Sequence, residues 1–145
     1  MKIEVASTEQ MLILGISLSA QLKAGDLVLI SGPLGAGKTV LAQGIGQGLG
    51  IDDITSPTFV ISRTHKAVLP MIHVDAYRLI DTENPNLYLD DLDLDTENSV
   101  TVVEWGGAES ARLSEDRLEI SIDRTNEIRQ VEIKAIGARW DGFAL

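Results

Sequence analysis

The sequence predicts an α/β fold with a central, mostly parallel sheet, an antiparallel hairpin at an edge and helices on both faces. Two segments, LVLIS at 27–31 and VTVVE at 100–104, are apolar at nearly every position, which is typical of parallel strands buried on both faces. Near the C-terminus, the segments 117–123 and 129–136 alternate polar and apolar residues, as in a hairpin with one wet face. Helical segments lie between the strands in the first half of the chain, which favours the α/β class.

The chain should begin with a short strand from Ile3 to Val5. Ser7 then caps a helix, because Gln10 follows at the capping-box spacing, and we expect this helix to run to about Lys23. Its apolar segment at 11–22 is too short to cross a bilayer, which needs roughly 20 apolar residues, and it has no basic lead-in. A cytoplasmic protein is therefore expected.

A turn at Gly25 and Asp26 leads into the strand at 27–31. We expect the second helix to run from Lys38 to about Leu49, with Gly50 as its stop signal. The strand and this helix are separated by a glycine-rich turn.

The second half of the chain continues the pattern of strands. Pro57 and Pro70 bracket a probable strand, FVISRTHK, and Met71 to Asp75 should form another. Asn84 and Pro85 resemble a helix cap followed by proline at the first helical position. The connection TNEI joins the two strands of the C-terminal hairpin.

Length and charge limit the classes of function. The chain has 145 residues, with 12 Lys and Arg against 22 Asp and Glu and a formal charge of −10. This length suits one domain, which buries about two-thirds of its unfolded surface. No cysteine occurs, which excludes disulfides, iron–sulfur clusters and thiolate zinc sites. The acidity disfavours direct binding to nucleic acid or anionic membrane, which both require clustered Lys and Arg.

Much of the acidity comes from one segment. Residues 81–97 hold seven acids and no base. A segment of this kind is either a solvated face or a docking surface for a basic patch on a partner.

The motif G-x-x-x-x-G-K-[ST] occurs once, as GPLGAGKT at residues 32–39. It follows a buried strand and opens a helix, which is the context of a phosphate-binding P-loop rather than of an ordinary glycine turn. Glycine lets backbone N–H groups point at phosphate oxygens, and the helix start presents further unpaired N–H groups. Lys38 should neutralise the β- and γ-phosphates, and the Thr39 hydroxyl should bind Mg²⁺. The residues expected to hold the nucleotide here are Gly32, Pro33, Leu34, Gly35, Ala36, Gly37, Lys38, Thr39 and Val40.

Two carboxylates could complete this site. Asp75 and Glu104 each end an apolar run, so each should lie at the carboxyl end of a parallel strand, where ligands collect in open α/β sheets. Either could hold Mg²⁺ or orient water; a solvated surface acid is the alternative. His65 and His73 are expected to be ordinary strand residues, because no Cys and no third His accompany them.

Four motifs together resemble the bacterial TsaE (YjeE) family. They are GPLGAGKT, SPTF at 56–59, HVDAYRL at 73–79 and VEWG at 103–106, in this order. Members of that family are small P-loop ATPases needed to make threonylcarbamoyladenosine in tRNA. The resemblance implies a single P-loop NTPase-like domain, residues 1–145, that binds ATP with Mg²⁺ and hydrolyses it slowly. It also implies the partner proteins TsaD and TsaB, which carry out the threonylcarbamoyl transfer, so that tRNA is engaged only through partners.

The resemblance also assigns roles by position. Lys38 and Thr39 would hold phosphate and metal, and Glu104 would be the carboxylate on the metal side. Asp75 would be a catalytic or water-positioning acid. Thr58 would lie in a switch-like loop that senses nucleotide. Trp105 would lie beside the nucleotide site, or it would be a packing residue.

Two other functions are consistent with a P-loop. A stand-alone small-molecule kinase would need several arginines around its acceptor phosphate, whereas Arg63, Arg78 and Arg112 are scattered. A nucleotide-dependent switch would act by binding rather than by turnover. A GTPase is disfavoured because no N-K-x-D motif is present. The C-terminal segment 139–145 is expected to pack back on the domain.

Overall fold

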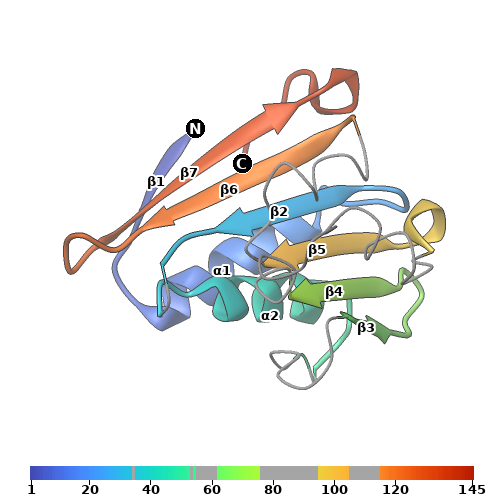
Figure 1. Cartoon of the computed structure of the whole chain (residues 1–145), viewed down its shortest axis with the longest axis horizontal. Helices are drawn as coiled ribbons and strands as arrows, with labels where there is room; N and C mark the ends of the chain where they lie inside the picture. Colours follow the sequence, from blue (N-terminus) through green and yellow to red (C-terminus); the bar gives the residue numbers. More distant parts are fainter. Residues whose placement is uncertain (34, 53, 55–61, 76–94, 105–114) are drawn as a thin grey trace, which may run out of the picture.

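A computed structural model describes residues 1–33, 35–52, 54, 62–75, 95–104 and 115–145. Its seven strands form one sheet in the order β1-β7-β6-β2-β5-β4-β3 (Figure 1). The strands are β1 (Lys2–Val5), β2 (Leu27–Ser31), β3 (Ser62–His65), β4 (Met71–Asp75), β5 (Val100–Glu104), β6 (Arg117–Asp123) and β7 (Arg129–Ile136). The helices are α1 (Thr8–Ser19) and α2 (Lys38–Gly48), with short 3₁₀ turns η2 (Thr96–Asn98) and η3 (Ala138–Trp140).

The centre of the sheet is parallel, as predicted. Strand β2 pairs in parallel with both β5 and β6, and β5 pairs in parallel with β4. The first four residues of β2 and all five of β5 are buried, which explains their continuous apolar runs. The carboxyl ends of these strands therefore meet at one edge of the sheet.

Antiparallel strands flank this centre on both sides. The predicted C-terminal hairpin is formed by β6 and β7, with Arg117 opposite Ile136 and Asp123 opposite Gln130. However, the hairpin is not the outermost element, because β1 pairs antiparallel with β7. On the other side β3 pairs antiparallel with β4. Of the predicted strand FVISRTHK, residues 62–66 lie within the described residues, and β3 covers Ser62–His65 of these.

Helix α1 begins as predicted and ends earlier. The Ser7 hydroxyl accepts a hydrogen bond from the Gln10 amide (3.1 Å), and the Gln10 side chain accepts one from the Ala6 amide (2.8 Å). The predicted end near Lys23 is wrong, because the helix stops at Ser19. The Lys23 amide donates instead to the Asp26 carboxylate (2.8 Å), so a side chain takes the place of a helical carbonyl. Helix α2 ends at Gly48, and Gly50 follows with φ +84°, as a stop signal requires.

The two helices touch through glycine. A Cβ on Gly15 would lie 2.5 Å from the Leu41 carbonyl oxygen, and one on Gly44 would lie 2.3 Å from the Leu12 carbonyl oxygen. Because only glycine fits at such distances, the backbones of α1 and α2 are in direct contact.

Both helices share one hydrophobic core with the sheet. This core includes Val28 and Ile30 of β2, whereas Leu27 and Leu29 are buried outside it. Since strand side chains alternate, α1 and α2 cover one face and the opposite face holds buried residues of its own. The helix expected from Asn84 lies outside the described residues.

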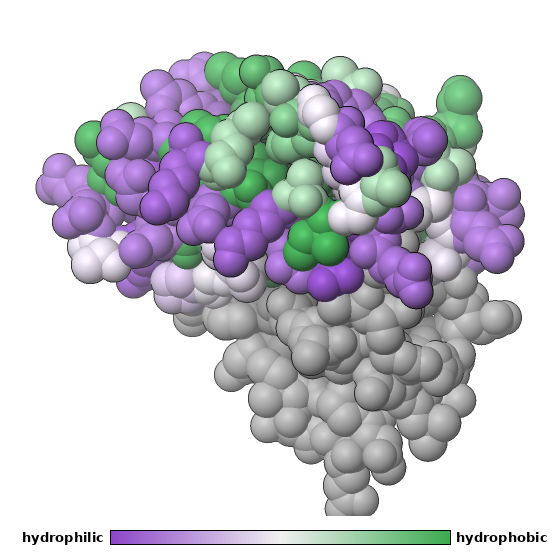
Figure 2. Space-filling view, turned by 90° about the horizontal axis from the view of Figure 1, so that it is seen from above, coloured by the Kyte–Doolittle hydropathy of each residue, from purple (hydrophilic) through white to green (hydrophobic). Residues whose placement is uncertain are grey.

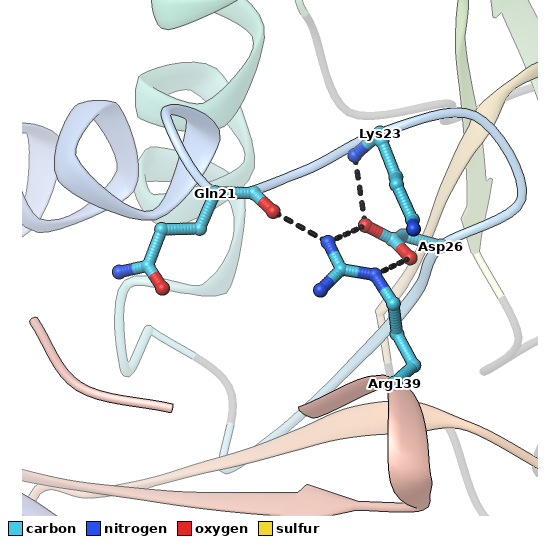
Figure 3. Close-up of polar contacts among 4 residues, drawn as sticks. All are labelled: Gln21, Lys23, Asp26 and Arg139. Carbon is cyan, nitrogen blue, oxygen red and sulfur yellow. Dashed lines mark hydrogen bonds and ion pairs between the residues drawn. The ribbon is translucent and has the colours of Figure 1, made fainter. Parts of the chain in front are cut away.

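The C-terminal segment packs on the domain, as predicted. Trp140 is buried and its ring meets Phe143 edge-on, with ring centres 5.7 Å apart. Arg139 stacks on the Trp140 ring and donates two hydrogen bonds to the buried Asp26 carboxylate (3.1 and 3.0 Å). The same guanidinium donates to the Gln21 carbonyl (2.8 Å), as Figure 3 shows. This cluster joins the chain terminus to the connection between α1 and β2.

Hydrophilic and hydrophobic side chains are interspersed on the coloured part of the face seen in Figure 2. No helix in the described part of the chain is long and apolar enough to cross a membrane.

We expect Gly44→Ala to destabilise the fold although alanine favours helices. The new methyl group would meet backbone atoms of α1, and overpacking of this kind costs about 1–3 kcal/mol. Chemical denaturation should show the loss, with Gln47→Ala on the exposed side of α2 as control. A Gly44→Ala protein more stable than wild type would contradict direct backbone contact.

We also expect Asp26→Ala to lower the free energy of unfolding by about 1–3 kcal/mol, because it leaves the partners of a buried carboxylate without an acceptor. The exposed pair of Glu132 and Lys134, 4.0 Å apart, supplies the control. Glu132→Ala should cost less than about 1 kcal/mol. Equal effects of the two substitutions in urea denaturation would refute a special role for the Asp26 cluster.

Candidate functional site

The glycine-rich loop at 32–37 lies at the carboxyl edge of the parallel strands, between β2 and α2. Gly37 adopts φ +109° and immediately precedes the first residue of α2, Lys38, as the motif predicts. A Cβ on Gly37 would lie 3.2 Å from the Met11 side chain, so both conformation and space favour glycine there. The start of α2 therefore presents its unpaired N–H groups toward the loop.

Lys38 is bound to the loop itself. Its ammonium group donates to the carbonyl oxygens of Gly32 (2.8 Å) and Pro33 (2.9 Å), and the residue is only 5% exposed. Burial lowers the pKa of Lys38, while the negative charges of Glu104 and Asp75 act in the opposite direction. The side chain thus spans the loop where an anion would be bound.

Glu104 and Thr39 meet beside Lys38. The Thr39 hydroxyl donates to Oε1 of Glu104 (2.9 Å), and Glu104 is 5% exposed at the end of β5. Asp75 ends the neighbouring strand β4 directly opposite Glu104. The structure therefore brings together all four of these predicted residues, and it distinguishes the carboxylates, because Glu104 is the one that is bonded to Thr39.

His73 lies in β4, as expected, and also contacts this cluster. It is fully buried, and its Nε2 atom pairs with Oε2 of Glu104. The sequence contained one signal for this contact. His73 precedes Asp75 by two residues in β4, so both lie on the same face of the strand.

The residues at this position fit a magnesium ion bound together with phosphate. A hydroxyl and a carboxylate are hard oxygen donors, and Mg²⁺ in phosphate sites commonly takes one or two protein ligands and completes its shell with phosphates and water. Within the described ranges there is no group of three or more His, Asp or Glu side chains suited to a metal. A metal held by Thr39 and Glu104 would accordingly depend on a phosphate ligand.

A cavity of about 290 Å³ adjoins the outer side of the glycine-rich loop. Arg129 of β7 forms part of its wall and donates to the carbonyl oxygens of Ala36 and Gly35 (both 3.3 Å). Arg129 therefore braces the loop from the hairpin, a role that the sequence did not reveal because about ninety residues separate the two. The residues that line the cavity are Val5, Ala6, Ser7, Thr8, Met11, Gly35, Ala36, Gly37, Val40, Glu127 and Arg129.

The expected nucleotide-binding residues divide into three groups. Lys38 and Thr39 lie on the strand side with the two carboxylates, where Gly32 and Pro33 accept the hydrogen bonds of Lys38. Four other residues line the outer cavity: Gly35, Ala36, Gly37 and Val40. The remaining predicted residues, Leu34, Thr58 and Trp105, lie outside the described residues.

Comparisons with known proteins agree on one family. The family model for threonylcarbamoyl adenosine biosynthesis protein TsaE matches residues 5–132. A tRNA threonylcarbamoyladenosine biosynthesis protein TsaE from Streptomyces coelicolor is 48% identical over 138 residues, 88% of this chain and 91% of the relative. The protein of the same name from Mycobacterium tuberculosis is 50% identical over 127 residues, 81% of this chain and 76% of the relative. The crystal structure of Bacillus subtilis YdiB superposes with a TM-score of 0.76 at 29% identity, covering 97% of this chain and 88% of that one.

We expect Lys38→Ala to abolish binding of ADP or ATP, because it removes the cation that spans the loop. The protein should still fold and unfold cooperatively. Burial of a charge is unfavourable, and its removal offsets part of the lost hydrogen bonding. Calorimetric titration with nucleotide measures the loss, and Lys134→Ala at an exposed site provides the control. Unchanged affinity in the Lys38→Ala protein would exclude the loop as the phosphate site.

Proposed function

The chain belongs to the TsaE family, and we propose that it binds ATP with Mg²⁺ and hydrolyses it slowly during formation of threonylcarbamoyladenosine in tRNA. The observation that supports this proposal most directly is the convergence of Lys38, Thr39 and Glu104 at the end of a glycine-rich loop. Each side chain has the chemistry that a nucleotide phosphate or its metal requires.

Phosphate binding would exploit groups that are already aligned. The Lys38 ammonium group would exchange two loop carbonyls for phosphate oxygens, which form stronger, charge-assisted hydrogen bonds. The N–H groups at the start of α2 would bind the same phosphates.

Thr39 and Glu104 would hold Mg²⁺, and this ion would neutralise charge on the β- and γ-phosphates. Asp75 would position water, because it ends the adjacent parallel strand and Glu104 is engaged by Thr39. This division of roles assigns the metal to one carboxylate and the attacking water to the other.

The cavity beside the P-loop is a suitable position for the adenine base. Its volume is close to the lower end of ligand pockets, roughly 300 Å³. Val5, Met11 and Val40 provide apolar surface for a flat ring, and Ser7 and Thr8 at the start of α1 provide polar atoms.

TsaD and TsaB are the proposed protein partners, in the cytoplasm. With a net charge of −10, this chain is poorly suited to bind tRNA directly. The proposal therefore leaves tRNA binding to the partners and nucleotide hydrolysis to this chain.

The cellular test is depletion of the protein followed by measurement of threonylcarbamoyladenosine in tRNA. The proposal predicts a loss of the modification that plasmid-borne wild type restores. Normal modification in depleted cells would refute it. Transfer of phosphate to a metabolite without any partner would instead support a stand-alone kinase.

We expect Glu104→Gln to slow ATP hydrolysis on the order of 100-fold, comparable with loss of one preorganised electrostatic group. Affinity for ATP measured in EDTA should change little, because Lys38 and the loop remain. Glu132→Gln on the exposed part of β7 is the matched control. Undiminished turnover would remove Glu104 from the reaction, and full restoration of tRNA modification by the inactive variant would favour a binding switch.

A further inference from the structure

We propose that His73 is a positioning residue that fixes the Glu104 carboxylate for metal binding. This inference rests on the proposed function and extends it to a residue with no expected role. His73 would not contact nucleotide or metal itself. It would act through Glu104, whose second oxygen it holds.

The geometry gives Glu104 one defined orientation. Its Oε1 accepts the Thr39 hydroxyl at 2.9 Å and its Oε2 pairs with Nε2 of His73. The two partners come from different elements, α2 and β4, on either side of the end of β5. A carboxylate held at both oxygens from opposite directions keeps a single rotamer.

The backbone register makes this contact possible. His73 lies opposite Val102 in the parallel pairing of β4 and β5, and Glu104 follows Val102 by two residues on the same face. His73 therefore reaches Glu104 diagonally across the strands. The contact requires the imidazole to carry its hydrogen on Nε2 when it donates to the carboxylate.

A packing role alone does not account for a histidine here. His73 is 0% exposed, and its Nδ1 has no hydrogen-bond partner among the described residues. Burial of a polar group without a partner is unfavourable, so an apolar ring of similar size would be better tolerated if filling space were the requirement. Within the described part of the chain, the one polar side-chain contact of His73 is with the proposed metal ligand.

Groups that orient a metal ligand affect metal affinity directly. Loss of such a partner commonly weakens metal binding or activity by roughly 10- to 100-fold. For this chain we expect a loss of metal affinity and not of nucleotide affinity. The hydrogen bonds from Lys38 to the loop carbonyls do not involve His73.

Two variants separate positioning from packing. His73→Phe fills the space without a donor, and His73→Gln retains an N–H donor at similar reach. We expect His73→Phe to weaken Mn²⁺ binding to the ADP complex, measured by electron paramagnetic resonance, by roughly 10- to 100-fold. His73→Gln should recover most of that loss. ADP affinity in EDTA should match wild type in both variants.

The outcomes are distinct. Wild-type Mn²⁺ affinity in a folded His73→Phe protein would overturn the inference, as would a His73→Gln protein as impaired as His73→Phe. If wild-type protein itself bound neither ADP nor Mn²⁺, the proposed function would fail instead.

A measurement on the wild type covers the case in which the variants do not fold. The chain has two histidines, so long-range ¹H–¹⁵N spectra contain two imidazole patterns, which His65→Gln would assign. When Mg²⁺ is added to the ADP complex, the signals of the His73 ring nitrogens should shift. The Mg²⁺ concentration at half of this shift should equal that at half-saturation of metal binding. His65, at the opposite end of the pairing between β3 and β4, serves as the internal control. Unmoved His73 signals would overturn the inference.

Discussion

A carboxylate buried at the end of the central sheet must be hydrogen-bonded, and the candidate site is organised around that requirement. Glu104 ends β5 with both oxygens engaged, one by α2 and the other by β4. Because unpaired buried charges are strongly unfavourable, the relative positions of these three elements are coupled. Lys38 begins α2 and Asp75 ends β4, so the contacts that join these two elements to Glu104 also bring both residues beside it.

Lys38 forms hydrogen bonds with its own loop. Its ammonium group is withdrawn from water and bonded to two carbonyls of its own loop. In the proposed function, a phosphate would replace these carbonyls and form charge-assisted hydrogen bonds, which are stronger. The surrounding carboxylates offset part of the desolvation that lowers the pKa of Lys38.

Local pattern predicted what depends on neighbours in sequence. The apolar runs at 27–31 and 100–104 identified parallel strands, and GPLGAGKT identified the turn between β2 and α2. Local pattern places His73 only on the same face as Asp75. Its contact with Glu104, like that of Arg129 with the loop, depends on strand register and on pairing between distant segments. The early end of α1 had a similar cause, since Asp26 binds the Lys23 amide and is itself held by Arg139 from the C-terminal segment.

The glycine contact between α1 and α2 has a mechanical consequence. Side chains that separate two helices can change rotamer and absorb small displacements, but Gly15 and Gly44 leave no such layer. A displacement of α2, which begins directly after the glycine-rich loop, would therefore act on the backbone of α1 without an intervening layer of side chains. The exposed residues of α1 include Ile13 and Ile16. The buried loop and this part of the surface are thus linked through direct backbone contact.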